Sequence, residues 1–242
     1  MGDWAPKRFW KQAHVAQTPD GFAVHLDGRA IKTPAKAAFL VPTRAFAEAV
    51  AAEWDAQAEV VTPSTMPLTR LANSAIDTVS VNFAAVADML ADYGGCDLIC
   101  YRAEGPPELV ARQETAWDPL LDWAGFEMGA PLTPAAGVIH VAQPAGSLAR
   151  MAEAVHALDP FRLAAFHDLV TISGSLVIAL ALIAGRLLPE DAWAAARIDE
   201  DWQAEHWGHD EEAADLAALR LRDFLSAHRA YLLLSEPEAA AG

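Results

Sequence analysis

The chain has 242 residues, of which 53% are hydrophobic and 21% charged, a composition typical of a folded protein with a substantial core. Its 33 acidic and 17 basic residues give a net charge of −16, which disfavours nucleic acid and anionic membrane surfaces as partners. The only cysteines are Cys96 and Cys100, so a disulfide framework is excluded and a reducing compartment is expected. Residues 1–12 have no apolar core, and no secretory signal is expected there.

The first forty residues are expected to form short strands. Thr18 to Gly21 is typical of a turn, and apolar side chains then alternate with small or polar ones through 22–26. Asp27-Gly28 predicts a hairpin turn. The chain would return over Ala30 to Thr33 and form a further short strand over Phe39 to Val41.

A helix is predicted after Pro42, with Thr43 as its N-cap. Phe46, Val50 and Trp54 follow at intervals of four and would form one apolar stripe, so Trp54 is expected in the core. Among the other tryptophans, Trp117 and Trp123 flank two leucines and are also expected in the core, whereas exposure is plausible for Trp4 and Trp10.

Helical periodicity dominates the rest of the chain. Apolar residues recur at spacings of three and four from 68 to 93. Further helix is expected over 109–126, 147–158, 161–188 and 190–231, with Gly208 interrupting the last stretch. We therefore predict an α+β fold with a domain boundary in the Pro-rich segment 62–67. A small N-terminal α/β domain (1–66) would be followed by a larger, mainly helical orthogonal bundle (67–242).

The segment from Leu169 to Leu188 is long enough and apolar enough to span a membrane. It contains Thr171, Ser173 and Gly185 among its apolar residues, and its flanks carry few basic residues. A central buried helix explains these features equally well. We expect a buried helix and no membrane insertion.

Motifs for catalysis are largely missing from the sequence. It has neither a Gly-rich phosphate loop nor a Gly-x-Ser-x-Gly elbow. Cys96 and Cys100 are four residues apart, which fits neither a redox pair nor a zinc site, and both are expected to be buried thiols. His206, His209 and Asp210 are the best metal candidate, and they define an alternative function as a metal-dependent hydrolase. Because a complete ligand set is missing, we expect no metal, no cofactor and no enzymatic activity.

The most acidic stretch of the chain contains two tryptophans. Its carboxylates are Asp199, Glu200, Asp201, Glu205, Asp210, Glu211, Glu212 and Asp215. A solvated helix face explains such a run, and so does a protein-binding surface in which aromatic anchors sit in a charged rim. Composition leaves the two readings equal. The residues that would bind a partner are Trp202, Glu205, Trp207, Asp210 and Glu211. Glu205 comes first, because the other acids also have a role at a helix start.

Several blocks of sequence resemble one known family. They are Phe9-Trp10-Lys11, Leu26-Asp27-Gly28-Arg29, Lys32-Thr33-Pro34, Glu53-Trp54-Asp55-Ala56-Gln57, Met66 to Ala72 followed by Ala75-Ile76-Asp77, Asp97 to Ala103, Trp117 to Leu121, and Trp207-Gly208 with Asp210-Glu211-Glu212. In this order, over residues 9–212, they resemble the assembly chaperones of the ATP synthase alpha subunit. The resemblance implies an ATP-independent chaperone that binds unassembled alpha subunit, shields its beta-facing surface and releases it on assembly.

The same resemblance sets expectations about location and assembly. Mitochondrial members of the family carry presequences, whereas folded sequence here is expected to begin almost at once. We therefore expect a bacterial cytoplasmic protein, with eukaryotic relatives in the mitochondrial matrix, and a monomer when free of its partner.

Overall fold

The fold is that of a computed structural model, which describes residues 7–208 and 210–235. The chain forms two compact units. The first contains residues 7–83 together with Asp159–Ala165 and 229–235. The second contains Ala84–Leu158 and Phe166–His228. Strands gather mainly in the first unit and helices dominate the second, so the α+β class predicted from the sequence is confirmed.

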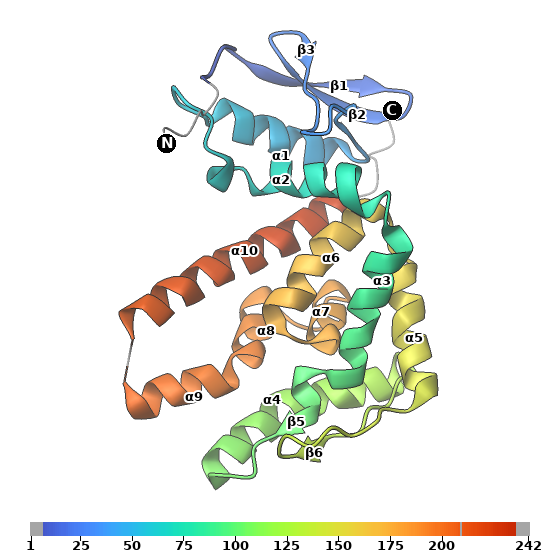
Figure 1. Cartoon of the computed structure of the whole chain (residues 1–242), viewed down its shortest axis with the longest axis vertical. Helices are drawn as coiled ribbons and strands as arrows, with labels where there is room; N and C mark the ends of the chain where they lie inside the picture. Colours follow the sequence, from blue (N-terminus) through green and yellow to red (C-terminus); the bar gives the residue numbers. More distant parts are fainter. Residues whose placement is uncertain (1–6, 209, 236–242) are drawn as a thin grey trace. The chain divides into compact units, whose positions relative to one another are not determined.

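The first unit contains a four-stranded antiparallel sheet centred on β2 (Figure 1). Its strands are β1 (Ala13–Thr18), β2 (Gly21–Leu26), β3 (Arg29–Ala30) and β4 (Leu40–Val41). The tight turn after Thr18 pairs Thr18 with Gly21, and the Asp27-Gly28 turn joins β2 to β3, as predicted. The returning strand β3 ends at Ala30 and is therefore shorter than the strand expected over Ala30 to Thr33.

Helix α1 (Arg44–Asp55) packs against this sheet. It begins where predicted, since the Thr43 hydroxyl accepts a hydrogen bond from the Phe46 amide at 3.3 Å. Phe46 and Val50 are fully buried. Trp54 is only half-buried, so the prediction that it lies in the core is wrong. Trp10, for which the sequence made exposure plausible, is only 4% exposed and meets the Trp54 ring edge-on at 5.2 Å. The reason is that the N-terminal segment folds back over the last turn of α1, where it covers one side of Trp54 and buries Trp10. Trp4 lies outside the described residues.

The predicted helix over 68–93 is interrupted. It consists of α2 (Pro67–Ser74), a π-helical turn η2 (Ala75–Val79) and α3 (Phe83–Ala91), after a short 3₁₀ turn η1 (Pro63–Thr65). The Ser80 amide and hydroxyl both bond the carbonyl of Ala75, which satisfies the backbone at the π turn. The apolar spacing of three and four continued across this break, so periodicity did not reveal it.

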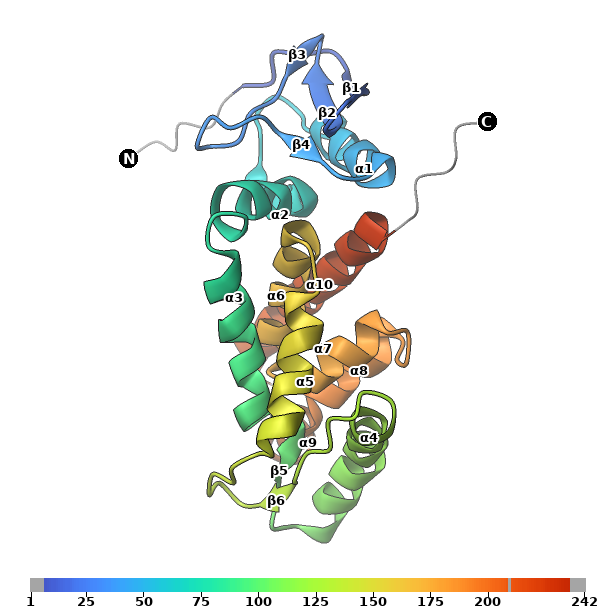
Figure 2. The ribbon, with the colours of Figure 1, turned by 90° about the vertical axis from the view of Figure 1, so that its right-hand side faces the viewer.

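The second unit is a helical bundle around the short helix α7 (Leu176–Ile183), whose residues 176–182 are all buried (Figure 2). Its other elements are most of α3, η3 (Asp92–Cys96), η4 (Leu98–Cys100), β5 (Tyr101–Arg102), α4 (Pro107–Phe126), β6 (Ala135–Ala136), α5 (Ala145–His156), α8 (Pro189–Ala196) and α9 (Ile198–Trp207). It also contains α6 (Pro160–Ser173) from Phe166 onward and α10 (Glu211–Ser235) as far as His228. Strands β5 and β6 form a short parallel pair. Trp117 and Trp123 are buried, as predicted, and the Trp117 indole donates to the Ala195 carbonyl at 2.8 Å.

The expected single helix over 161–188 is wrong, because the chain breaks between α6 and α7 at Gly174, which adopts φ +71°. Ser175 then caps α7 by accepting from the Ile178 amide at 3.0 Å. Within the described ranges, no single helix is long and apolar enough to cross a membrane. The length and composition criteria are met only by Pro67–Val79 and Phe83–Cys100 taken together, and the chain bends by 107° between these two segments.

A carboxylate lies fully buried at the start of α7. Asp97 accepts hydrogen bonds from the Ser175 hydroxyl at 2.6 Å and from the Val177 amide at 3.0 Å. Burial is the dominant influence and raises the pKa of Asp97 to about 6, against the lowering effect of these bonds.

The two cysteines differ in exposure. Burial raises the pKa of the Cys100 thiol to about 12, as suits an inert structural cysteine. Cys96 is exposed, contrary to expectation, because it ends η3 at the surface.

Candidate functional site

The acidic-aromatic stretch spans α9 and the start of α10. Gly208 ends α9 with φ +100°, which confirms the predicted interruption. The Asp210 carboxylate accepts a hydrogen bond from the Glu212 amide at 3.0 Å, and it therefore caps the first turn of α10. His209 lies outside the described residues.

Glu205 and Trp202 contact helix α4. Both carboxylate oxygens of Glu205 accept from the guanidinium of Arg112, each at 2.9 Å. This bidentate hydrogen bonding holds the pKa of Glu205 below its usual range. Arg112 also lies over the Trp202 ring, 5.0 Å from its centroid, and the His206 ring stacks on Trp202 with the two centroids 4.0 Å apart. These side chains therefore form one surface cluster that joins α9 to α4.

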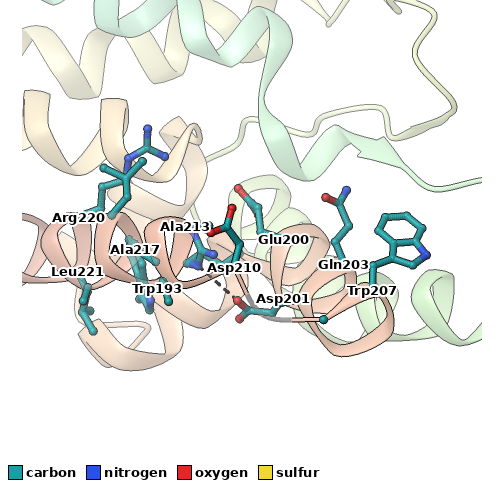
Figure 3. Close-up of a pocket in the computed structure, with 16 residues that line it drawn as sticks. Trp193, Glu200, Asp201, Gln203, Trp207, Asp210, Ala213, Ala217, Arg220 and Leu221 are labelled. Atoms are coloured by element: carbon teal, nitrogen blue, oxygen red, sulfur yellow. Dashed lines mark ion pairs between the residues drawn. The ribbon is translucent and has the colours of Figure 1, made fainter.

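Trp207 and Asp210 instead line a groove between α9 and α10 (Figure 3). The groove has a volume of about 660 Å³. Trp193 of α8 also lines the groove. The other lining residues of the groove are Arg197, Glu200, Asp201, Gln203, Ala204, Gly208, Ala213, Ala214, Leu216, Ala217, Ala218, Arg220 and Leu221. The Trp207 side chain is 80% exposed. A large aromatic ring in this position is available to a partner protein.

The five residues predicted to bind a partner thus divide between two places. Trp202 and Glu205 belong to the α4 cluster, Trp207 and Asp210 line the groove, and Glu211 is exposed in the first turn of α10. The structure does not place Glu205 among the groove residues beside Asp210, because its carboxylate is turned toward α4.

Two contributors to this region were missed in the sequence. Arg112 lies 93 positions before Glu205, and nothing local marks it as a partner. Trp193 lies in a short alanine-rich helix, with Arg197 5.3 Å above its ring, and Arg197 in turn pairs with Asp201 at 3.4 Å. The sequence did contain a signal for the wall of the groove. Apolar residues occupy nearly every side of the helix over 213–221, which gives more apolar surface than one buried face requires.

The charge of the region is one-sided. Residues 199–215 contain eight carboxylates and no lysine or arginine. Three of the eight carboxylates have side-chain partners. Asp199 accepts from Gln113 of α4 at 2.6 Å, Glu205 pairs with Arg112 of α4, and Asp201 pairs with Arg197 at the start of α9. Glu200, Asp210, Glu211, Glu212 and Asp215 are exposed. The surface around the groove is therefore suited to a basic partner.

A metal centre finds no support among the described residues. Across 7–208 and 210–235, no three or more His, Cys, Asp or Glu side chains lie close enough to hold an ion. The Nδ1 atom of His206 lies 2.8 Å from the Trp202 carbonyl. Since His209 is not described, the predicted set of His206, His209 and Asp210 is not tested as a whole.

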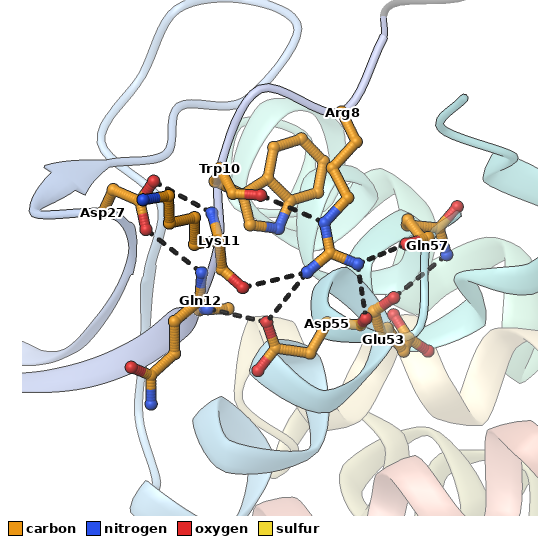
Figure 4. Close-up of polar contacts among 9 residues, drawn as sticks. Arg8, Trp10, Lys11, Gln12, Asp27, Glu53, Asp55 and Gln57 are labelled. Atoms are coloured by element: carbon orange, nitrogen blue, oxygen red, sulfur yellow. Dashed lines mark hydrogen bonds and ion pairs between the residues drawn. The ribbon is translucent and has the colours of Figure 1, made fainter. Parts of the chain in front are cut away.

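A second polar cluster involves the block Glu53 to Gln57 (Figure 4). Arg8 donates to four backbone carbonyls, those of Trp10, Lys11, Asp55 and Gln57. Asp55 accepts from the Ala13 amide at 2.7 Å, and Glu53 accepts from the Leu68 and Thr69 amides at 2.7 and 2.8 Å. The cluster therefore fastens the N-terminal segment and the start of α2 to the end of α1. Its charged side chains Arg8, Glu53 and Asp55 all bond backbone groups of the protein itself, which indicates a structural role, although the buried indole nitrogens of Trp10 and Trp54 have no partner among the described residues.

Comparisons with known proteins agree with the fold and with the sequence blocks. The family model described as ATP12 chaperone protein matches residues 7–125. The crystal structure of Atp12 from Paracoccus denitrificans is 49% identical, with a TM-score of 0.92 over 94% of this chain and 98% of that one. The Atu1473 protein of Agrobacterium tumefaciens is 44% identical, with a TM-score of 0.91 over 95% and 87%. Mitochondrial protein atp12 of Schizosaccharomyces pombe is 26% identical over 87% of this chain and 76% of its own length. The resemblance seen in the sequence is thereby confirmed, and the chain belongs to the ATP12 family of chaperone proteins.

Proposed function

We propose that this protein is an ATP-independent assembly chaperone that binds the unassembled alpha subunit of the ATP synthase catalytic head. It shields the beta-facing surface of that subunit and releases it on assembly. Membership of a chaperone family supports the general role. The observation that carries a binding role for this chain is Trp207, whose ring is 80% exposed within the most acidic part of the sequence.

The physical basis is the exposed interface of an unassembled subunit. A head subunit without its neighbours exposes a large apolar surface, which favours aggregation. A chaperone that covers this surface stabilises the free subunit by mass action. When the beta subunit competes for the same surface, the chaperone is released without nucleotide hydrolysis. No catalytic step is needed for this cycle.

The proposed partner surface consists of Trp202, Glu205, Trp207, Asp210 and Glu211. Trp207 is the anchor, because it combines large area with nearly complete exposure. The exposed carboxylates raise the association rate with a basic surface and make it sensitive to salt. We place the protein in the bacterial cytoplasm, as a monomer until it binds, and its eukaryotic relatives in the mitochondrial matrix.

The central experiment mixes the purified chain with isolated alpha subunit and measures the mass of the product by size-exclusion chromatography with light scattering. We expect a one-to-one complex that disappears when beta subunit is added. Trp207→Ala should weaken binding at least tenfold, as expected for an aromatic anchor. Phe126→Ala is the control, since Phe126 is 87% exposed but lies at the end of α4, away from the site. If no complex forms with the parent protein, the proposal is wrong.

Glu205 requires a paired design, because Glu205→Lys would also set two positive groups against each other at Arg112. Exchanging the charges, with Glu205→Arg and Arg112→Glu in one variant, preserves an ion pair between the helices but moves the negative charge to α4 and removes the contact of Arg112 with the Trp202 ring. Arg112→Gln alone is the control for the loss of that ring contact. If Glu205 contacts the partner, the exchanged variant binds alpha subunit at least several-fold more weakly. Normal binding by the exchanged variant would limit Glu205 to a structural role.

A further inference from the structure

Helix α10 has an apolar face that lines the groove between α9 and α10 in its first half and is buried farther along the same helix. Phe224 and Ala227 are buried, at 0% and 2% exposure. One to three turns earlier, Ala213, Ala217 and Leu221 stand at intervals of four and line the groove. Ala213 is exposed and Ala217 and Leu221 are half-buried, so the apolar face passes from a packed core into an open groove.

We propose that this groove receives an amphipathic α-helix of the client protein, with its bulky apolar side chains against α10 and a lysine or arginine near Asp210. The inference rests on the proposed function and specifies how the client is held. An amphipathic helix that lays its apolar face in a groove is a recurrent mode of recognition.

The shape of the groove suits large side chains from a partner. Five alanines line it, Ala204 on α9 and Ala213, Ala214, Ala217 and Ala218 on α10. Their short side chains leave space between the two helices, while Trp193 and Trp207 add broad apolar surfaces to the lining, with Trp207 at the end of α9 (Figure 3). Leucine-sized residues at spacings of three and four on an incoming helix would fill the space beside the alanines.

The charges of the groove favour one polarity of occupant. Asp210 lies at the end nearest the turn between the helices, where Glu211 and Glu212 follow it. Arg220 lies about three turns farther along α10. A helix with basic residues toward the Asp210 end and acidic residues toward Arg220 is complementary to both ends.

Two other occupants are less suitable on physical grounds. A second copy of this chain would bring the same acidic rim and a net charge of −16 toward itself. The C-terminal residues 236–242 have the sequence Glu-Pro-Glu-Ala-Ala-Ala-Gly, which supplies no leucine-sized apolar side chain. The client helix therefore fits the shape and the charge of the groove better than either of these two occupants.

The test compares two matched leucines of α10. Leu216 is 48% exposed and lines the groove, whereas Leu219 is 44% exposed and does not. Both are replaced by aspartate, and both variants are checked for an unchanged melting temperature and mass before titration against isolated alpha subunit. We expect Leu216→Asp to weaken binding at least tenfold and Leu219→Asp to bind within twofold of the parent protein.

Cross-linking identifies the occupant directly. Benzoylphenylalanine placed at Ala217 should cross-link to a helical segment of the alpha subunit that carries apolar residues at helical spacing and a nearby lysine or arginine. This second measurement also decides the matter if Leu216→Asp does not fold. A cross-link to an acidic or extended segment would overturn the inference.

The outcomes separate this inference from the proposed function. If the parent protein binds alpha subunit and Leu216→Asp binds equally well, the groove is not the docking site, while the chaperone function stands. If the parent protein does not bind alpha subunit, both are overturned. If Leu216→Asp instead converts a dimer of the free protein to a monomer, the occupant is a second copy and the inference is wrong.

Discussion

The buried carboxylate of Asp97 gives the protein a pH-dependent stability that can be measured. Its pKa is about 6 in the folded protein, against an ordinary value of 3.8. Because burial raises the pKa, folding favours the protonated acid, and its stabilising contribution is complete below pH 3.8 and is lost as the pH rises through 6. The difference between 3.8 and about 6 corresponds to about 3 kcal/mol of unfolding free energy.

The perturbation is Asp97→Asn, which keeps the shape of the side chain but removes its titration. The asparagine loses one acceptor, because it meets both the Ser175 hydroxyl and the Val177 amide with a single oxygen. That loss costs about 1–3 kcal/mol and does not vary with pH. The difference in unfolding free energy between parent and variant should therefore fall as the pH rises, by about 3 kcal/mol in total and by roughly half of this between pH 5 and 8.

The assay is urea unfolding of both proteins at several pH values from 5 to 8, above the sequence pI of about 4.7. Subtracting the two stabilities at each pH cancels the titration of groups that the proteins share. A difference that stays constant over this range would show that the hydrogen bonds offset the burial of Asp97. A difference that grows with pH would refute the reasoning, because the folded protein would then favour the charged form.

Three other substitutions should lower stability for distinct reasons. Trp117→Ala removes a fully buried indole and should lower the unfolding free energy by about 3–5 kcal/mol in urea titrations; a loss below 1 kcal/mol would contradict its place in the core. Glu53→Ala removes the carboxylate that caps α2 and should cost about 1–2 kcal/mol, visible as faster amide exchange in the first turn of α2, whereas unchanged exchange would speak against the cap. Gly21→Ala should cost roughly 2 kcal/mol, because Gly21 has φ +132° and an added Cβ would lie 2.6 Å from the Val41 carbonyl oxygen. Gly129→Ala is its control, with φ +66° and open space around it, and equal melting shifts for the two variants would exclude the clash as the cause.

Local signals determined much of the secondary structure. The Asp27-Gly28 turn, the Thr43 cap and the stop at Gly208 were all recognised correctly, since each depends on backbone geometry within a few residues. The ordered family blocks were also sufficient to identify the chaperone family, and the change from strand to helix periodicity was sufficient to indicate the α+β class. The break at Gly174 was missed because continuous apolar sequence on both sides masked a change of direction, which is made at φ +71°, a conformation that favours glycine.

The amino-acid sequence thus determined the local elements and the family, whereas the tertiary structure decided what each side chain meets. Trp10 is buried and Trp54 is only half-buried, because the N-terminal segment folds over the end of α1. Glu205 was paired by Arg112, 93 positions away. Trp193 was brought to a groove whose walls come from two other helices. Burial and ion pairing depend on contacts between distant segments, and these are properties of the packed chain that periodicity along one helix cannot specify.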